Sequence, residues 1–183
     1  MNHYFNITLL PDAEMPAPVL MNAICAKVHK QLYDIQSKTI GISFPKYDVT
    51  LGNILRIHGN DADLQKLHGA SWLGGMNGYC KISAIFLVPE KVQYRIISRI
   101  QPTMSPTKLQ RLLKRGTITD GKVKDYKAKM FAKGLDEPYV ELVSASNGHN
   151  HRRYIKLGEL LDKPVAGIFD QFGLSKTATV PWF

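Results

Sequence analysis

The first 90 residues switch between the hydrophobic period of a strand and that of a helix, and the order of these switches restricts the fold. Apolar residues alternate over 4–10. Over 17–35 they recur at the spacing of one helix face, at Met21, Ile24, Cys25, Val28 and Leu32. Pro11, Pro16 and Pro18 interrupt the pattern between these two segments. The remaining segments are predicted strands over 39–44, 52–58 and 79–88 and a short helix from Asn60, a favourable cap, to about Leu67.

The predicted order is therefore strand, helix, strand, strand, helix, strand, which is the order of a ferredoxin-like split βαβ arrangement. The charge changes just after this unit. Residues 1–94 carry a net charge of +1, and residues 95–183 carry a net charge of +8. We expect an α+β protein with a ferredoxin-like domain over 1–91 and a basic α+β domain over 92–183.

The second half is predicted to begin with a strand over 94–101 and to continue with two basic helices. Ser105 caps the first helix, Pro106 occupies its first position and Gly116 ends it. The second helix and the later segments follow from the same patterns: a helix over about 119–133, strands near 139–144 and 152–157, and an apolar tail.

Positive charge is concentrated between Arg95 and Lys133. This segment holds eleven basic and only two acidic side chains, a net of +9 that equals the net charge of the whole chain. A field focused on one segment usually faces a polyanion. The segment also contains Arg99 and Gln101, whose side chains match guanine and adenine edges in bidentate fashion. Nucleic acid is therefore the expected partner, with duplex DNA binding as a weaker alternative to RNA.

The first basic helix carries its cations without acidic neighbours. Lys108, Arg111, Lys114 and Arg115 repel one another, and no acid between 105 and 115 relieves the repulsion. Such residues often form a solvated surface, but this concentration favours a face that phosphates neutralise, along or within the groove of an RNA stem.

His29 lies on the flank of the apolar stripe of the first helix, where a histidine is commonly structural or simply exposed. It is also the side-chain type best suited to proton transfer at neutral pH. His149 and His151 lie beside a polar, turn-prone stretch that contains Ser144 and Ser146. That stretch is either a plain hairpin loop or a loop that offers hydroxyl and imidazole groups to RNA.

The sequence contains no phosphate-binding glycine loop, dinucleotide fingerprint, zinc signature or paired acids for two-metal chemistry. We therefore expect no cofactor and no metal. Metal-free cleavage of nucleic acid usually uses a ribose 2′-hydroxyl as nucleophile with histidine assistance, which restricts the substrate to RNA. Cys25 and Cys80 are far apart in apolar contexts and are predicted to be buried thiols in a reducing compartment.

The longest apolar run, 84–88, is far too short to cross a bilayer. The N-terminus lacks the basic and apolar regions of a secretory signal. We expect a cytoplasmic protein that does not associate with membranes.

Several segments together resemble a known family. They are the opening Met-Asn-His-Tyr-Phe-Asn-Ile-Thr-Leu, the histidine in Ala-Lys-Val-His-Lys-Gln-Leu, Ile42-Ser-Phe-Pro45, Ser98-Arg99-Ile-Gln101 with the basic helix, Ser144-Ala-Ser146-Asn-Gly148, and the ending Phe172-Gly-Leu-Ser-Lys176 with Val180-Pro-Trp-Phe183. They resemble the CRISPR-associated endoribonuclease of type I-F systems, which cuts precursor CRISPR RNA within each repeat. The resemblance extends from one end of the chain to the other.

The resemblance implies roles for individual residues. His29 matches the general base toward the 2′-hydroxyl, and Ser144 matches the serine that orients this hydroxyl, with Ser146 as the competing choice. Arg99 and Gln101 match the readers of the stem's closing base pairs. The arginine-rich helix of the family matches Lys108, Arg111, Lys114 and Arg115.

Several positions depart from the family. The family's tyrosine near the scissile phosphate is Phe172 here, so the resemblance implies that Phe172 binds the RNA without a phenol hydroxyl. Leu112 and Gly116 stand where the family's basic helix has arginine. The aromatic residue that stacks at the base of the hairpin corresponds to His151.

The implied activity is cleavage at the 3′ base of a repeat hairpin, leaving a 2′,3′-cyclic phosphate and a 5′-hydroxyl without a cofactor. The protein would stay bound to the hairpin and join the other protein subunits of the type I-F surveillance complex. The alternative is a non-catalytic subunit that only binds and caps the guide RNA.

Overall fold

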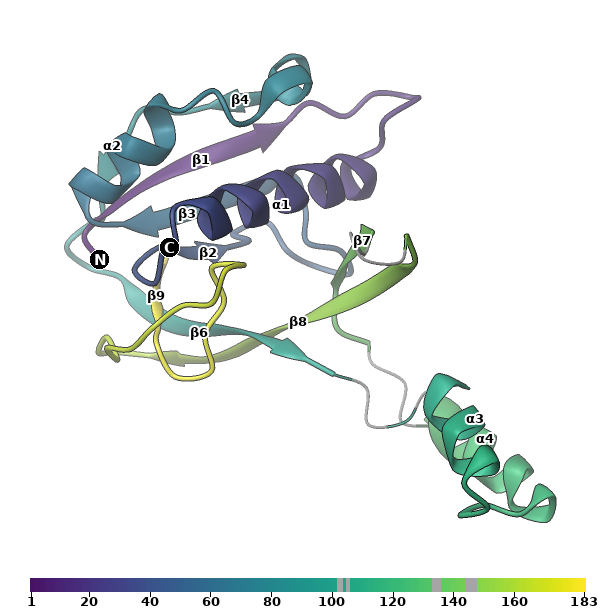
Figure 1. Cartoon of the computed structure of the whole chain (residues 1–183). Helices are drawn as coiled ribbons and strands as arrows, with labels where there is room; N and C mark the ends of the chain where they lie inside the picture. Colours follow the sequence, from purple (N-terminus) through teal and green to yellow (C-terminus); the bar gives the residue numbers. More distant parts are fainter. Residues whose placement is uncertain (102–103, 105, 133–135, 144–147) are drawn as a thin grey trace.

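The computed structural model describes residues 1–101, 104, 106–132, 136–143 and 148–183, and these residues form a mixed α+β structure with two antiparallel sheets (Figure 1). The first sheet has the strand order β2-β3-β1-β4, and β5 also pairs with β1. Its strands are β1 (His3–Leu9), β2 (Gly41–Ser43), β3 (Ile54–Gly59), β4 (Cys80–Ile82) and β5 (Phe86–Leu87). Each strand pair in this sheet is antiparallel.

Helix α1 (Ala17–Asp34) packs its apolar stripe into the core, and α2 (Asp61–Gly69) covers the same sheet. The buried side chains of α1 are those predicted from the period, with Leu20 added to them: Leu20, Met21, Ile24, Cys25, Val28 and Leu32. Asn60 caps α2 as predicted, because its side-chain oxygen accepts the backbone N–H of Asp63 at 2.8 Å. A 3₁₀ helix, η1 (Gly74–Tyr79), precedes β4.

The single strand predicted over 79–88 is wrong, because the structure divides it into β4 and β5. Ser83 interrupts the ladder between them. Its backbone N–H donates to the carbonyl of Asn6, and its Oγ accepts the N–H of Asn6 at 3.0 Å. A serine hydroxyl that replaces a ladder partner is a known local competitor of regular pairing.

The second sheet has the order β7-β8-β6-β9. Its strands are β6 (Gln93–Ile100), β7 (Tyr139–Val143), β8 (Asn150–Leu161) and β9 (Val180–Trp182). β8 is longer than the predicted 152–157. β9 has no strand pattern in the sequence, but it pairs with β6 at the sheet edge, where Pro181 needs no ladder donor.

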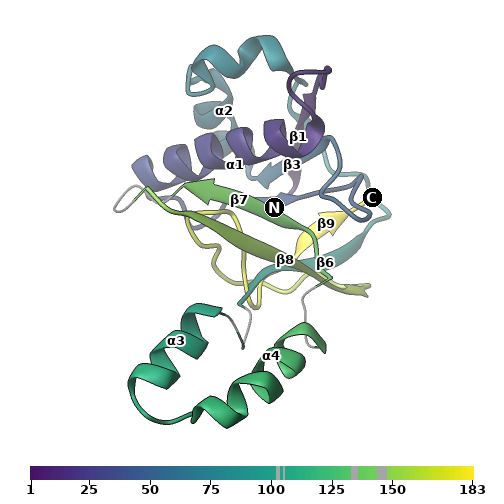
Figure 2. The same cartoon turned by 90° about the vertical axis from the view of Figure 1, so that its right-hand side faces the viewer.

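The basic segment forms α3 (Pro106–Lys114), a 3₁₀ turn η2 (Asp120–Lys122) and α4 (Val123–Ala132). Figures 1 and 2 show α3 and α4 side by side and apart from both sheets. Gly116 ends α3 as predicted, since it adopts φ +66 and its N–H donates to the carbonyl of Leu113. The predicted cap Ser105 lies outside the described residues.

A continuous hydrophobic core joins the two sheets. It includes Phe5 and Ile24 from the first half and Ile97, Ile155 and Val180 from the second. Contacts of α1 with both β1 and β7 place this helix between the sheets.

Close packing also marks the junction of β2 with β9. A side chain at Gly41 would bring its Cβ within 2.6 Å of Val180.

Cys25 and Cys80 are buried thiols, as predicted, and burial raises the pKa of Cys25 to about 12. Among the helices that the structure describes, none is long and apolar enough to cross a membrane.

Candidate active site and nucleic-acid interface

His29 lies on α1 with its imidazole at the surface rather than in the core. Its Nδ1 lies 2.9 Å from the backbone carbonyl oxygen of Gln171. A carbonyl oxygen can only accept a hydrogen bond, so Nδ1 carries the proton in the neutral ring. Nε2 therefore holds the lone pair, and it is the nitrogen that can accept a proton from a substrate.

The ring of Phe172 stacks on the His29 imidazole. The ring centroids are 3.5 Å apart and the planes differ by 11°. The guanidinium carbon of Arg153 lies 3.4 Å from the same phenyl centroid. Both distances correspond to van der Waals contact, so the two groups cannot share one face of the ring. Phe172 is thus held between an imidazole on one face and a guanidinium on the other.

A tight turn over 170–174 holds Phe172 in this position. The Asp170 carboxylate accepts the backbone N–H groups of Phe172 at 2.8 Å and of Leu174 at 3.0 Å. Gly173 adopts φ +69, and its carbonyl accepts the N–H of Ile42 on β2. A Cβ at Gly173 would lie 2.7 Å from the Ile42 side chain, so only glycine fits this turn without a shift. The Gly-Leu-Ser-Lys sequence therefore docks Phe172 beside α1.

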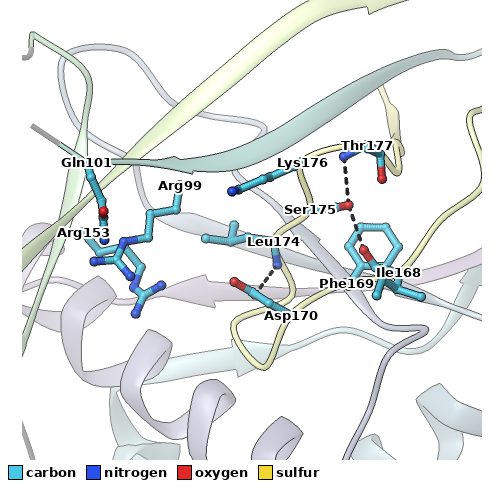
Figure 3. A pocket seen from close by; sticks show the side chains of 10 residues that line it. All are labelled: Arg99, Gln101, Arg153, Ile168, Phe169, Asp170, Leu174, Ser175, Lys176 and Thr177. Atoms are coloured by element: carbon cyan, nitrogen blue, oxygen red, sulfur yellow. Dashed lines mark hydrogen bonds between the residues drawn. The ribbon is translucent and has the colours of Figure 1, made fainter. Parts of the chain in front are cut away.

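A cavity of about 600 Å³ opens beside this turn (Figure 3). Arg99, near the end of β6, and Gln101, just beyond it, both line this cavity, as expected for residues two apart on a strand. Figure 3 shows these two side chains gathered with Arg153 on one side and the segment 175–177 on the other. A neighbouring cavity of about 410 Å³ is lined by Arg99, Arg153 and Phe172, so the two spaces connect the predicted base readers to the His29 stack.

The electrostatics of these cavities are dominated by cations. Arg153 is only 8% exposed, and burial together with the nearby charge of Arg99 lowers its pKa to about 10, whereas Asp170 acts in the opposite direction. One oxygen of the Asp170 carboxylate, Oδ1, accepts two backbone N–H groups. Lys176 adds a further positive charge at the rim. The arrangement favours an anionic ligand.

The basic residues predicted on the first basic helix lie away from these cavities. Lys108, Arg111 and Lys114 are on α3, and Arg115 follows its last residue; all are exposed. Because α3 stands apart from α1 in Figures 1 and 2, the structure does not bring these residues to His29. A ligand that contacted both sets would have to be extended, as a nucleic-acid stem is.

His151 is exposed on β8, where it pairs with Leu142 of β7. It lies two residues before Arg153 and therefore on the same side of the strand. Ser144 and Ser146 lie outside the described residues. Among the described residues, no three His, Cys, Asp or Glu side chains gather where they could hold a metal ion. The expectation of metal-free chemistry stays a prediction.

Sequence reasoning missed Arg153, Asp170 and Gln171. A signal existed for Arg153, because strand alternation puts it on the same side as Ile155 and Leu157, which are apolar. A cation on the same side of a strand as apolar residues is expected to be buried. Gln171 contributes its backbone carbonyl, so its side-chain identity carried no signal.

The fold and the site define a mixed α+β protein with a surface histidine beside a cationic cavity. Comparison with known proteins agrees with this description. Residues 4–183 match the family model described as CRISPR-associated protein (Cas_Csy4). The chain therefore belongs to this family of CRISPR-associated proteins, as the sequence resemblance predicted.

Two relatives are similar to this chain over the full length of both proteins. The "CRISPR-associated endonuclease Cas6/Csy4" of Escherichia coli (strain UTI89 / UPEC) is 38% identical over 184 residues. The protein of the same name from Pseudomonas aeruginosa (strain UCBPP-PA14) is 36% identical over 187 residues.

Proposed function

We propose that this protein is an endoribonuclease that cuts precursor CRISPR RNA at the 3′ base of a repeat hairpin, without a metal ion or other cofactor. The observation that carries the proposal is the His29 imidazole, whose Nδ1–H is held by the Gln171 carbonyl beside a cationic cavity. Membership of the family, and the endonuclease names of both relatives, support nucleic-acid cleavage.

In this proposal, Nε2 of His29 accepts the proton of the ribose 2′-hydroxyl. The 2′-oxygen then bonds to the adjacent phosphorus while the bond to the 5′-oxygen of the next nucleotide breaks. The leaving oxygen takes up a proton, which gives a 2′,3′-cyclic phosphate and a 5′-hydroxyl. Phe172 has no hydroxyl, so its role is to hold the imidazole in place. Ser144, with Ser146 as the competing choice, orients the 2′-hydroxyl.

The hairpin contacts divide into base and backbone contacts. Arg99 and Gln101 read the closing base pairs, and His151 stacks at the base of the stem. The cations of α3 contact the phosphates along the stem, namely Lys108, Arg111, Lys114 and Arg115. Figure 1 shows α3 apart from α1, so contact with both would need one extended stem.

At the level of the fold, we propose that residues 1–91 form a ferredoxin-like domain and residues 92–183 form the RNA-hairpin-binding domain. The strand order β2-β3-β1-β4 with antiparallel neighbours supports the first half of this division. The protein acts in the cytoplasm, where it stays on the cut hairpin and joins the other subunits of the type I-F surveillance complex.

The test is incubation of the purified protein with repeat hairpin RNA in excess EDTA. We expect cleavage at the 3′ base of the stem, a 2′,3′-cyclic end, and no cleavage when the ribose at that position is a 2′-deoxyribose. Loss of activity in EDTA that magnesium restores would contradict the proposal. Binding of the hairpin without cleavage would favour the alternative, a subunit that only caps the guide RNA.

A further inference from the structure

Arg153 is a buried cation whose Nε is left without an acceptor in the described part of the chain. Its residue is 8% exposed, and its Nε has no hydrogen-bond acceptor among the residues that the structure describes. Its neighbour Arg152 is different, because that guanidinium is exposed, lies 4.5 Å from the ring of Tyr139, and is 3.5 Å from Glu141. The unusual state of Arg153 is therefore not a general property of this part of β8.

Such a guanidinium is costly in the free protein. Burial of a charge is unfavourable unless an opposite charge or hydrogen-bond acceptors compensate it. The carboxylate of Asp170 offsets part of this cost, but its Oδ1 accepts the N–H groups of Phe172 and Leu174, and the described residues show no ion pair between Asp170 and Arg153. The positive charge of Arg99 destabilises the charged form of Arg153 further. The charge of Arg153 is therefore only partly compensated, and the cavity beside it has room for an anion.

The orientation of Arg153 indicates which anion fits. One face of the guanidinium lies on Phe172, so its N–H edge is what remains for a ligand. That edge is suited to bidentate recognition of phosphate oxygens. A neutral base edge would leave the charge of Arg153 uncompensated, whereas a phosphate would compensate it.

We propose that Arg153, in the cavity lined by Arg99 and Lys176, binds one backbone phosphate of the RNA close to the cleavage site. The proposal rests on the function proposed above and adds a substrate contact to it. Because His29 and Arg153 lie on the two faces of the same phenyl ring, a phosphate on Arg153 is a near neighbour of the nucleotide that His29 acts on.

The first test measures hairpin affinity at several salt concentrations, with a 2′-deoxyribose at the cleavage site so that nothing is cut. Arg153→Met is expected to weaken binding roughly 10- to 100-fold, the usual range for a lost charged hydrogen bond. It should also reduce the slope of log affinity against log salt by about 0.7–0.9, the value for one phosphate. The matched control is Arg152→Met, which removes the same charge from the opposite side of β8 and should change the slope less.

The second test uses the unmodified protein and hairpins that carry a single methylphosphonate at successive positions around the cleavage site. A neutral linkage at one position should weaken binding to the wild type and have no further effect on Arg153→Met. If no position near the cleavage site is sensitive in the wild type, the proposal is wrong, even if Arg153→Met does not fold.

An Arg153→Met variant with the salt slope of the wild type would also overturn the proposal that Arg153 binds a phosphate. These readouts depend on binding alone. A protein that binds the hairpin but does not cut it would refute the catalytic function and leave this test intact, whereas a wild type that binds no hairpin would refute both proposals.

Discussion

A backbone carbonyl decides which nitrogen of His29 is available. Gln171 is far from His29 in the sequence, but its carbonyl oxygen holds the imidazole Nδ1 proton, and Phe172 holds the plane of the ring. Both contacts reduce the freedom of the imidazole before any ligand arrives. Such preorganisation raises the rate of a proton transfer more than it raises substrate affinity.

We predict that His29→Ala slows hairpin cleavage by about 10²–10⁴-fold, the usual contribution of a general base. Affinity for the hairpin should change little, because the base acts in the transition state. Single-turnover cleavage and equilibrium binding measure the two effects separately.

The control for that experiment is His68→Ala. His68 lies on a different helix, α2, and one of its ring nitrogens is also hydrogen-bonded to a backbone carbonyl, that of Ser83. The His68→Ala protein should cut at the wild-type rate. If His29→Ala loses affinity as strongly as rate, His29 is a binding or folding residue instead.

His58 should make stability depend on pH. It is fully buried against Ser43, and burial, then Arg56 and the N-terminal ammonium, lower its pKa to about 3. In the unfolded chain its pKa is near 6.5. Between these two pH values, His58 binds a proton in the unfolded state but not in the folded state. This contribution to stability is complete above about pH 6.5 and is lost as pH falls toward 3.

From about pH 6 to about pH 5, the free energy of unfolding should fall by about 1 kcal/mol more in the wild type than in His58→Gln. Urea unfolding at the two pH values measures this difference. Parallel behaviour of the two proteins would mean that His58 takes up its proton over the same pH range in the folded protein as in the unfolded chain.

The turn over 170–174 connects β2 to the candidate site, because Gly173 accepts the N–H of Ile42 and Phe172 stacks on His29. We predict that Gly173→Ala lowers the free energy of unfolding by about 2–4 kcal/mol. The left-handed backbone contributes about 1–2 kcal/mol of this, and the contact with Ile42 contributes the rest.

The matched control is Gly116→Ala, because Gly116 has nearly the same φ but no atoms within 4 Å of an added Cβ. It should cost only about 1–2 kcal/mol. Denaturant unfolding gives both values. Equal losses would show that backbone strain alone, and not the docking on β2, makes Gly173 necessary.

Helix α3 is the second element with a testable role. Replacing Lys108, Arg111, Lys114 and Arg115 together with alanine should weaken binding to all hairpin stems alike and reduce the salt slope by up to about one unit per charge. An unchanged salt slope in the fourfold variant would mean that α3 faces solvent in the complex.

Arg99→Ala should reduce discrimination between stem sequences, because base contacts carry specificity.

For the whole molecule, the shared core predicts cooperative unfolding. Because Phe5 and Ile24 pack in the same cluster as Ile97 and Val180, neither sheet keeps its buried face covered without the other. Loss of one sheet would expose apolar surface of the other, at about 25 cal/mol per Å².

The two tryptophans can report on the two sheets separately. Trp72 packs against the core from the segment after α2, and Trp182 packs against it from β9. We predict that Trp72→Phe and Trp182→Phe proteins, each with one remaining reporter, give the same fluorescence midpoint in urea. Two separated midpoints would indicate independent domains on either side of residue 91.

Most of the local structure could be predicted from patterns among residues close together in the chain. Hydrophobic period predicted α1 and its buried stripe, Asn60 predicted the start of α2, and Gly116 predicted the end of α3. Motifs spread along the chain predicted the family, which the comparisons confirm. The roles of His29, Arg99 and Gln101 came from the same motifs and stay predictions.

The folded structure was needed to find the features that depend on residues far apart in the chain. It interrupted the strand at Ser83, paired β9 with β6, and placed Arg153 against Phe172. Periodicity and caps record the interactions of a residue with its near neighbours, so they carry no information on these contacts. The candidate site is made of such long-range contacts, and for this reason its chemistry could be predicted residue by residue while its geometry could not.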